Sequence, residues 1–417
     1  MDSNYFLPRD VKDELRNSAL APHVDAYLAD LNRGRYAHNT VSQYLRCITH
    51  FARWMQQTNL SLNKLDEAAV TRFLSKHLPH CHCPTPVVRG HDDLRAACGH
   101  LLRVLREHGA IAMPALARGP IEDEIRDFDA YMQQVRGLGS ETRRNCVRMV
   151  RRFLRRRFGK RAVVISALQP NDIRQFLAEE LDKRGTYSNA AALASSLRAY
   201  FRYRRFRGDH VHHLTGVIAS PAHWNLAALP RSLSNDEIER LLGAFPDSLP
   251  SSRRGYAMVR CALDIGLRIS EIAKLALADI DWQNGTVTLR RNKSRREDIL
   301  PLPAVTGQAI ADYLRLERPP TTNPAVFVRR LAPHDVPITA YTVHRLIRDA
   351  YQRIGITHTR THALRHSVAR RLLEQGSSLK EVADVLRHRS LNTSLIYAKL
   401  DNRKLAAVAL PWPGSAT

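Results

Sequence analysis

Apolar residues at helical spacing dominate the first half of the chain. Between residues 41 and 55 they fall on one face of a helix, at Val41, Tyr44, Leu45, Ile48, Phe51, Ala52 and Met55. A second stripe lies within residues 143–161, at Val147, Val150, Phe153 and Leu154. This spacing predicts bundles of amphipathic helices, each with one buried face.

The helical pattern is repeated along the chain. Residues 21–110 and 121–210 read as two copies of one unit, because DAYL at Asp25–Leu28 corresponds to DAYM at Asp129–Met132. Thr40 and Phe51 recur 102 residues later as Thr142 and Phe153, and Leu65, Phe73 and Leu74 recur 103 residues later as Leu168, Phe176 and Leu177. Self-similarity at a fixed offset indicates a repeated structural unit, so we expect two bundles of about four helices each.

The second half mixes helical patterns with short strand patterns. Asn284-Gly285 between DIDW and TVTL is a hairpin signal, and RNKSRRE before DILPLP predicts a second turn. A helix is predicted to begin at a capping box formed by Ser234 and Glu237. AMVRCALDIG, ISEIAKL, TAYTVHRLIRDAYQRIG and the stretch after His362 predict further helices. We therefore expect a mostly helical domain with a small antiparallel sheet.

These patterns predict a mainly α protein of three folded parts. We expect an N-terminal helical bundle at 1–115, a second helical bundle at 116–218, a linker rich in prolines and small residues at 219–233, a mostly helical domain with the small sheet at 234–404 and a C-terminal tail at 405–417. The first bundle is less basic than the second, so it can serve as a second grip on the same partner or as a protein-interaction module.

The charge points to a polyanionic partner. The 417 residues contain 64 Lys and Arg against 40 Asp and Glu, a formal net charge of +24 with much of the excess in arginine. The chain shows no signal-peptide pattern and no run approaching the roughly 20 apolar residues of a membrane span. Six cysteines scattered over this length do not predict a disulfide framework. We expect a cytoplasmic protein that binds nucleic acid and not a membrane; a membrane-surface protein or a merely soluble basic protein is the alternative.

Arginines are concentrated in the second bundle. We expect two of its helices to contact DNA phosphates, because few acidic residues are interleaved with the arginines and their charges would repel one another without a counter-anion. The alternative is a solvated basic face. The candidates are Arg143, Arg144, Arg148, Arg151, Arg152, Arg155, Arg198, Arg202 and Arg205.

A loop in the first bundle is rich in histidine and cysteine. It reads HLPHCHCPTPVVRGHDD and contains His77, His80, Cys81, His82, Cys83 and His91, with Cys98 following. These residue types can hold zinc. The spacing does not match a standard zinc finger, however, and the prolines favour a plain loop, so no metal ligand is assigned from the sequence.

The candidates for chemistry lie mostly near the C-terminus. His362 and Arg365 are three residues apart on one helical face, and Tyr397 follows His388 by nine residues. Arg268 is expected in a helix junction with Glu271 positioned to orient it, and Lys293 near a hairpin tip. A tyrosine hydroxyl becomes a useful nucleophile only where cations stabilise the charge that develops on its target. Singly, each of these residues is as readily explained by core packing or a basic surface.

Together, these residues resemble the catalytic domain of the tyrosine recombinases, the phage integrase family. GLRISEI around Arg268, the hairpin lysine, HALRH, LRH and Tyr397 occur in the family's order between about residues 230 and 400. The two helical bundles resemble the family's core-binding domains, although one copy is usual. Arg387 stands where the family usually has glycine, which can loosen helix packing or add a phosphate contact.

The resemblance implies a reaction and a role for each residue. Tyr397 would attack the scissile phosphodiester and form a 3′-phosphotyrosyl link, with Arg268 and Arg365 clamping the phosphate oxygens and Glu271 orienting Arg268. Lys293 would protonate the leaving 5′ oxygen, His362 would assist proton transfer, and His388 would donate a hydrogen bond to the phosphate. The covalent link conserves the energy of the broken bond, so no cofactor, ATP or metal is expected.

The resemblance also implies an assembly. We expect a homo-tetramer on DNA, alone or together with related recombinases, in which the tail at 405–417 is exchanged between subunits. The expected outcome is integration, excision or transposition of a mobile element. A tail folded back on its own subunit is the alternative. Two other functions remain open: a type IB topoisomerase or telomere resolvase, and a DNA-binding regulator with an inactive site.

Overall fold

The computed structural model describes residues 9–84, 87–114, 118–184, 187–219, 231–290, 297–356, 361–388, 390 and 393–400. Residues 112–224 form one compact unit, and residues 1–111 group with residues 225–417 in another. The expected hairpin lysine Lys293, most of the expected linker and the tail at 405–417 lie outside the described residues. No helix in the described ranges combines the length and the apolar character needed to cross a membrane.

The first bundle is built around one long helix. Its elements are α1 (Arg9–Arg16), η1 (Ala21–His23), α2 (Val24–Arg33), α3 (His38–Gln57), η2 (Leu62–Lys64), α4 (Glu67–Arg72), the π-helical turn η3 (Phe73–His77), η4 (Leu78–His80) and α5 (His91–Glu107). The predicted stripe on α3 is buried except for the half-buried Tyr44. This face packs on α5 and fills the core of the bundle.

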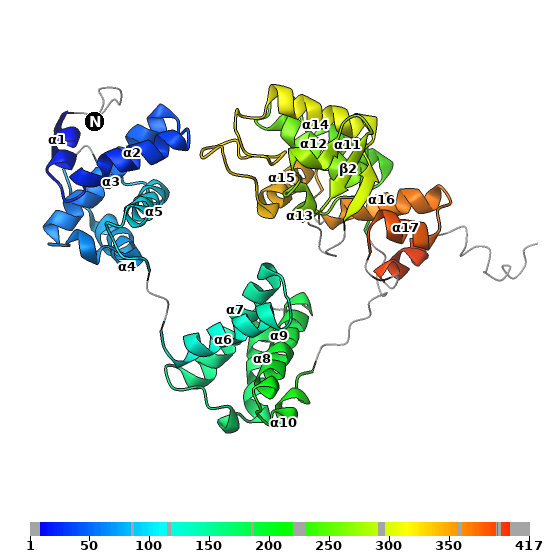
Figure 1. The fold of residues 1–417 in the computed structure, drawn as a ribbon, viewed down its shortest axis with the longest axis horizontal. Coiled ribbons are helices and arrows are strands. Elements are labelled where there is room, and N and C mark those ends of the chain that lie inside the picture. The colour runs from blue at the N-terminus through cyan, green and yellow to red at the C-terminus, as the bar shows by residue number, and fades with distance from the viewer. Residues whose placement is uncertain are drawn as a thin grey trace, which may run out of the picture. The chain divides into compact units, whose positions relative to one another are not determined.

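The second bundle repeats parts of this design. It contains α6 (Pro120–Gln134), α7 (Ser140–Phe158), η5 (Ile165–Ala167), α8 (Pro170–Arg184), α9 (Tyr187–Phe206) and α10 (His212–Thr215), shown from cyan to green in Figure 1. Phe51 of α3 and its counterpart Phe153 of α7 are both fully buried. Phe73 and its counterpart Phe176 are at most 2% exposed. The 3-10 turns η2 and η5 start 103 residues apart, as the repeat predicts.

The remaining described residues form a mostly helical domain with a small sheet. Its helices are α11 (Asn235–Gly243), α12 (Ser252–Asp264), α13 (Ile269–Ile272), η6 (Leu277–Asp279), α14 (Ala304–Leu316), α15 (Ala340–Arg353), α16 (His362–Glu374), α17 (Leu379–Val385) and η8 (Leu395–Leu400). The central α12 packs on α14, α15 and α16, and it buries apolar residues along most of its length. The expected capping box of Ser234 and Glu237 starts α11.

The sheet is the predicted pair of hairpins. Strands β1 (Ile280–Asp281), β2 (Thr286–Leu289) and β3 (Asp298–Pro301) are antiparallel in the order β1-β2-β3, with Ile280 opposite Val287 and Val287 opposite Leu300. Gly285 adopts φ +60° in the first turn, a conformation that glycine tolerates without strain. The fold class predicted from the sequence, with two helical bundles and a mostly helical domain carrying a small antiparallel sheet, is confirmed.

Candidate active site

Tyr397 is buried among the last helices of the candidate catalytic domain, near α16 and α17. It lies on η8 and packs in a small core with Val368 and Leu373 of α16 and Val382 of α17, leaving 2% of the residue exposed. Its hydroxyl lies 2.8 Å from Nδ1 of His366. The ring of His388 stacks nearly parallel to it, with the ring centroids 6.1 Å apart and the planes 10° from parallel. The phenol is thus placed between two imidazoles.

Arg268 is fixed by the helix that it precedes. Gly266, at φ +66°, turns the chain after α12, and Arg268 is the N-cap of α13. Glu271 accepts hydrogen bonds from the backbone N–H of Arg268 at 2.8 Å and from its guanidinium at 2.6 Å. The Arg268 side chain also donates to the carbonyl of Arg387 at 3.0 Å, yet remains 22% exposed. The arginine is therefore oriented without being withdrawn from solvent.

Arg365 approaches the same turn from α16. Its guanidinium donates to the carbonyls of Gly266 and Leu386, and the residue is only 7% exposed. Burial, together with the nearby positive charges of Arg268 and Arg387, lowers the pKa of Arg365 to about 9. Since this value is still above neutral pH, the guanidinium keeps its charge there.

A third arginine completes this cluster. Arg387 follows α17, and its guanidinium forms a 2.8 Å ion pair with Glu271 and donates to the carbonyl of Gly266 at 3.2 Å. Burial opposes ionisation of Glu271, but Arg387 and Arg268 together hold its pKa below the usual value. One buried carboxylate is thus shared between two guanidiniums, and a third guanidinium lies beside them.

The protonation states of the site follow from its burial. Burial and the positive charge of Arg365 lower the pKa values of His366 and His388 to about 4, so both imidazoles are neutral at pH 7. Burial raises the pKa of Tyr397 to about 12, and Arg365 partly offsets this rise. The resting tyrosine is therefore a neutral phenol, and a neutral imidazole lies within hydrogen-bond distance to accept its proton.

The structure brings together most of the residues selected from the sequence. Arg268, Glu271, Arg365, His388 and Tyr397 meet around the turn after α17. His362 is the exposed first residue of α16, close enough to His366 to lower its pKa. Lys293 lies outside the described residues.

Three residues of this site were not assigned from the sequence. His366 is four residues after His362 on the same helix, which is the one local signal for it. Ser394 is fully buried, with its hydroxyl 2.6 Å from Nδ1 of His388. Arg387 appeared in the sequence only as a departure from the family pattern. None of the three contacts with Tyr397, His388 or Glu271 can be inferred from local sequence spacing.

The arginines of the second bundle are not uncompensated, which corrects one premise of the sequence analysis. Acidic residues of α6 and α8 lie opposite α7, so the charges of its arginines are balanced without a counter-anion. The pairs are Arg143–Asp129, Arg151–Glu122, Arg155–Glu122 and Arg152–Glu180 between helices, with Arg144–Glu141 inside α7. Arg148 contacts Asn145, and Arg198 donates to the carbonyl of Ile218.

Two of the predicted arginines differ from the others. Arg202 and Arg205 on α9 are exposed, and no ion pair involves either of them within the described part of the chain. Ion pairs at the surface contribute at most about 1 kcal/mol, so a phosphate can replace a carboxylate at the paired positions. The unpaired positions need no such exchange, and they are the strongest candidates for phosphate contact in this bundle.

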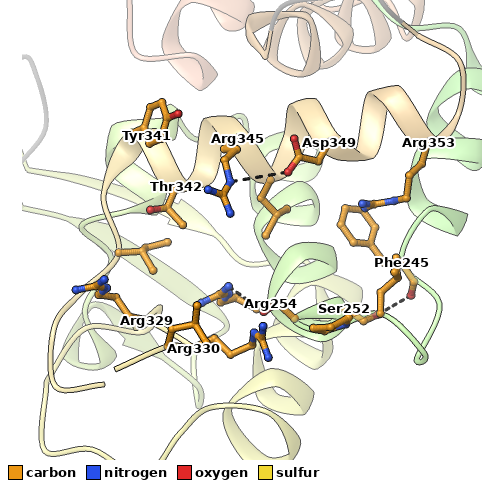
Figure 2. A pocket seen from close by; sticks show the side chains of 16 residues that line it. Phe245, Ser252, Arg254, Arg329, Arg330, Tyr341, Thr342, Arg345, Asp349 and Arg353 are labelled. Carbon is orange, nitrogen blue, oxygen red and sulfur yellow. Dashed lines mark hydrogen bonds and ion pairs between the residues drawn. The ribbon is translucent and has the colours of Figure 1, made fainter. Parts of the chain in front are cut away.

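A separate basic hollow lies on the domain that carries Tyr397. Its volume is about 390 Å³, and it lies between α15, the loop before this helix and the turn between α11 and α12 (Figure 2). Arg254 is engaged there with the carbonyl of Val328 at 2.8 Å, whereas Arg329, Arg330 and Arg345 are exposed. None of the catalytic candidates lines this hollow, so it is distinct from the site around Tyr397.

Comparison with known proteins agrees with this arrangement. The model of the phage integrase family matches residues 231–404, and the model of the phage integrase N-terminal SAM-like domain matches twice, over residues 24–79 and 125–208. The two matches to the SAM-like domain account for the repeat seen in the sequence, because each copy of the repeated unit contains one of them.

Individual relatives extend the similarity to most of the chain. The putative integrase/recombinase y4rA of Sinorhizobium fredii is 34% identical over 391 residues, covering 93% of this chain and 92% of the relative. The tyrosine recombinase XerD of Listeria innocua is 28% identical over 69% of this chain and 97% of its own. The structure of XerH recombinase bound to palindromic difH substrate shares the fold, with a TM-score of 0.52 at 18% identity over 88% of this chain and 95% of that one. This chain belongs to the phage integrase family of tyrosine recombinases.

Proposed function

We propose that this protein cuts and rejoins double-stranded DNA at specific sites through a covalent link to Tyr397. The observation that carries the proposal is the phenol of Tyr397 held 2.8 Å from a neutral imidazole, in a site where Arg268 and Arg365 converge. A structure of the Tn1549 transposon integrase with the same fold, at a TM-score of 0.51, is of a complex with a circular intermediate DNA, which supports DNA as the substrate.

In the proposed reaction, the oxygen of Tyr397 attacks phosphorus while its proton passes to Nδ1 of His366. The bond from phosphorus to the 5′ oxygen breaks, and Lys293 supplies the proton that this leaving oxygen takes up. One ester bond replaces another, so the 3′-phosphotyrosyl link keeps the energy of the broken bond. A 5′-hydroxyl of a second strand then reverses the step and regenerates the tyrosine.

The arginines stabilise the charge that develops on the phosphate. Arg268, exposed on one side and fixed by Glu271 on the other, is positioned to bind a non-bridging oxygen. Arg365 adds a second guanidinium with its charge intact. His388 acts as a donor: when the Ser394 hydroxyl donates to Nδ1, the neutral ring carries its proton at Nε2. His362, exposed at the start of α16, assists proton transfer.

DNA is held chiefly by basic residues on helices. Arg202 and Arg205 of α9 lead this set, followed by Arg143, Arg144, Arg148, Arg151, Arg152, Arg155 and Arg198. On the catalytic domain we add Arg329, Arg330 and Arg345, which the sequence analysis did not select. These side chains contact phosphates and so position the protein on the duplex without reading its sequence.

We further propose that recombination takes place in a homo-tetramer that pairs two DNA sites, with the tail at 405–417 packing on a neighbouring subunit. The expected outcome is integration, excision or transposition of a mobile element, carried out at the nucleoid in the cytoplasm. The repeated SAM-like domain supports this assembly, because a second helical bundle can grip DNA or a partner subunit. A plasmid without recombination sites should not be relaxed, in contrast to the action of a topoisomerase.

The direct test uses a nicked suicide substrate made from the DNA that flanks the gene. Wild-type protein should form a covalent adduct at the scissile phosphate, and Tyr397→Phe should form none while binding the DNA as tightly. Tyr351→Phe is the matched control, because this tyrosine is also buried in the same domain and its hydroxyl has no hydrogen-bond partner among the described residues. Adducts that persist in Tyr397→Phe would show that another residue is the nucleophile.

A further inference from the structure

Two histidines and two cysteines of the first bundle converge at a site that the reaction does not use. His50 projects from the middle of α3, His77 ends the π-helical turn η3, and Cys81 and Cys83 follow η4. Their four ligand atoms all lie within 4.8 Å of one another. His77 and both cysteines stand out in the sequence as a cluster, whereas His50 lies 27 residues before His77 and is not part of it.

Three distances within this cluster match those of a tetrahedral metal site. Nε2 of His50 lies 3.4 Å from Nε2 of His77 and 3.3 Å from Sγ of Cys81, and Sγ of Cys83 lies 3.6 Å from Nε2 of His77. Zinc with bonds of about 2.05 Å to nitrogen and about 2.3 Å to sulfur separates tetrahedral ligands by about 3.3 Å for two nitrogens and about 3.6 Å for nitrogen and sulfur. These three pairs need shifts of only a few tenths of an ångström to bind zinc, and all four ligand atoms lie within 4.8 Å of one another.

The tautomer of His50 is set for metal binding. Its Nδ1 lies 2.9 Å from the carbonyl oxygen of Val88, and a carbonyl can only accept a hydrogen bond. Nδ1 therefore carries the proton, and the lone pair of Nε2 faces the other three ligands. A hydrogen bond from the remote ring nitrogen to a carbonyl is the usual outer support of a zinc-bound histidine. His77 is supported by its nearly parallel stacking on Phe73, with the ring centroids 5.4 Å apart.

The surrounding chain supports the loop at Cys83 and Pro84. A guanidinium nitrogen of Arg53 donates to the carbonyl of Pro84 at 2.8 Å, and Arg89 donates to the carbonyl of Cys83 at 3.3 Å. His50 and Cys83 are buried, whereas His77 and Cys81 are half-buried. The π-helical turn that presents His77 is a rare conformation that recurs at functional sites. Three separate segments thus contribute ligands from supported positions.

We propose that the first bundle holds a structural zinc ion bound by His50, His77, Cys81 and Cys83. Two imidazoles and two thiolates are a donor set typical of tetrahedral zinc, and two thiolate charges neutralise the divalent ion inside the bundle. Four protein ligands leave no open position for a substrate, so the role is to fasten the loop after η4 onto α3. The site belongs to the bundle and not to the strand-exchange chemistry.

The test begins with the metal content of the untagged full-length protein, purified without chelators. Wild-type protein should contain one zinc per chain, and the double variant Cys81→Ser, Cys83→Ser should contain almost none. The matched control is His80→Ala with His82→Ala, which removes two exposed histidines from the same loop and should keep the zinc. A strong chelator should lower the melting temperature of wild type and of the control, but not that of the serine variant.

A second measurement does not depend on how the variants fold. Wild-type protein exchanged with cobalt should show the thiolate-to-cobalt charge-transfer absorption of a tetrahedral site. Three results would each overturn the proposal: wild-type protein that contains no zinc and shows no cobalt absorption, a serine variant that keeps its zinc, or a Cys81–Cys83 disulfide in the native protein.

Discussion

Arg387 combines an unfavourable backbone conformation with a favourable side-chain position. It follows α17 with φ +52°, while its N–H donates to the carbonyl of Asp384 and the N–H of His388 donates to that of Ala383, both at 2.9 Å. This is the helix-ending motif in which glycine is preferred. The left-handed conformation of a residue with a Cβ costs about 1 kcal/mol, which is the physical reason for the glycine usual in the family.

The side chain of Arg387 offsets this cost. It is 7% exposed, and its guanidinium pairs with Glu271 at 2.8 Å. A hydrogen bond between charged groups contributes about 2 kcal/mol, which exceeds the backbone cost. Glu271 retains Arg268 when Arg387 is removed, so the carboxylate does not become an isolated buried charge. The cost of the left-handed backbone and the gain from the ion pair with Glu271 can therefore be measured separately by two substitutions of Arg387.

Arg387→Ala removes the ion pair and keeps the strained backbone, so α17 should lose about 2 kcal/mol of local stability. Arg387→Gly removes both features and should lose only about 1 kcal/mol, because the strain is relieved. Hydrogen exchange of the peptide spanning residues 378–388 measures these changes without contributions from the other domains. The exposed Arg370→Ala, which breaks the ion pair of Arg370 with Glu374, is the control and should change protection by less than about 1 kcal/mol.

Two results would refute this reasoning. Equal protection in the alanine and glycine variants would mean that the left-handed conformation at residue 387 costs nothing or is not adopted. An alanine variant as stable as wild type would mean that the ion pair with Glu271 provides no net stabilisation.

Three further predictions concern pH, the turn beside the site and salt. Burial lowers the pKa of His366 from the usual value of about 6.5 to about 4, so the folded state binds fewer protons than the unfolded state between these pH values. The melting temperature should therefore fall as the pH is lowered from about 6.5 to about 4, and it should fall by less in His366→Gln. An equal fall in wild type and variant would contradict the lowered pKa of His366. Gly266→Ala puts a Cβ on a residue with φ +66° and places it 2.9 Å from a methyl group of Leu386. The strain and the clash together should destabilise the domain by about 2 kcal/mol, which lowers the melting temperature and the yield of covalent adducts. An unchanged melting temperature would contradict this. Replacing Arg202 and Arg205 by alanine should reduce the slope of the logarithm of the DNA-binding constant against the logarithm of the salt concentration by about 0.9 for each lost phosphate contact. Arg152→Ala, which removes an arginine paired with a carboxylate, should change this slope less. An unchanged slope in the double variant would mean that α9 does not contact DNA.

Local patterns in the sequence were sufficient for the elements and for part of the site. The helical stripe of α3 and the Asn284-Gly285 hairpin are set by residues a few positions apart, where backbone geometry alone decides which side chains share a face. The repeat was recognisable from a constant offset between matching residues, because both copies bury corresponding aromatic residues such as Phe51 and Phe153. The spacing of His362 and Arg365 was readable for the same reason.

The contacts between distant segments were decided by tertiary structure alone. Periodicity cannot say that His366 lies against Tyr397, 31 residues away, or that Arg387 meets Glu271, 116 residues away. The scarcity of acidic residues within α7 was likewise misleading, because the carboxylates that pair with its arginines lie on other helices. Side chains so far apart in the chain become neighbours only through the packing of whole helices, which no local spacing records.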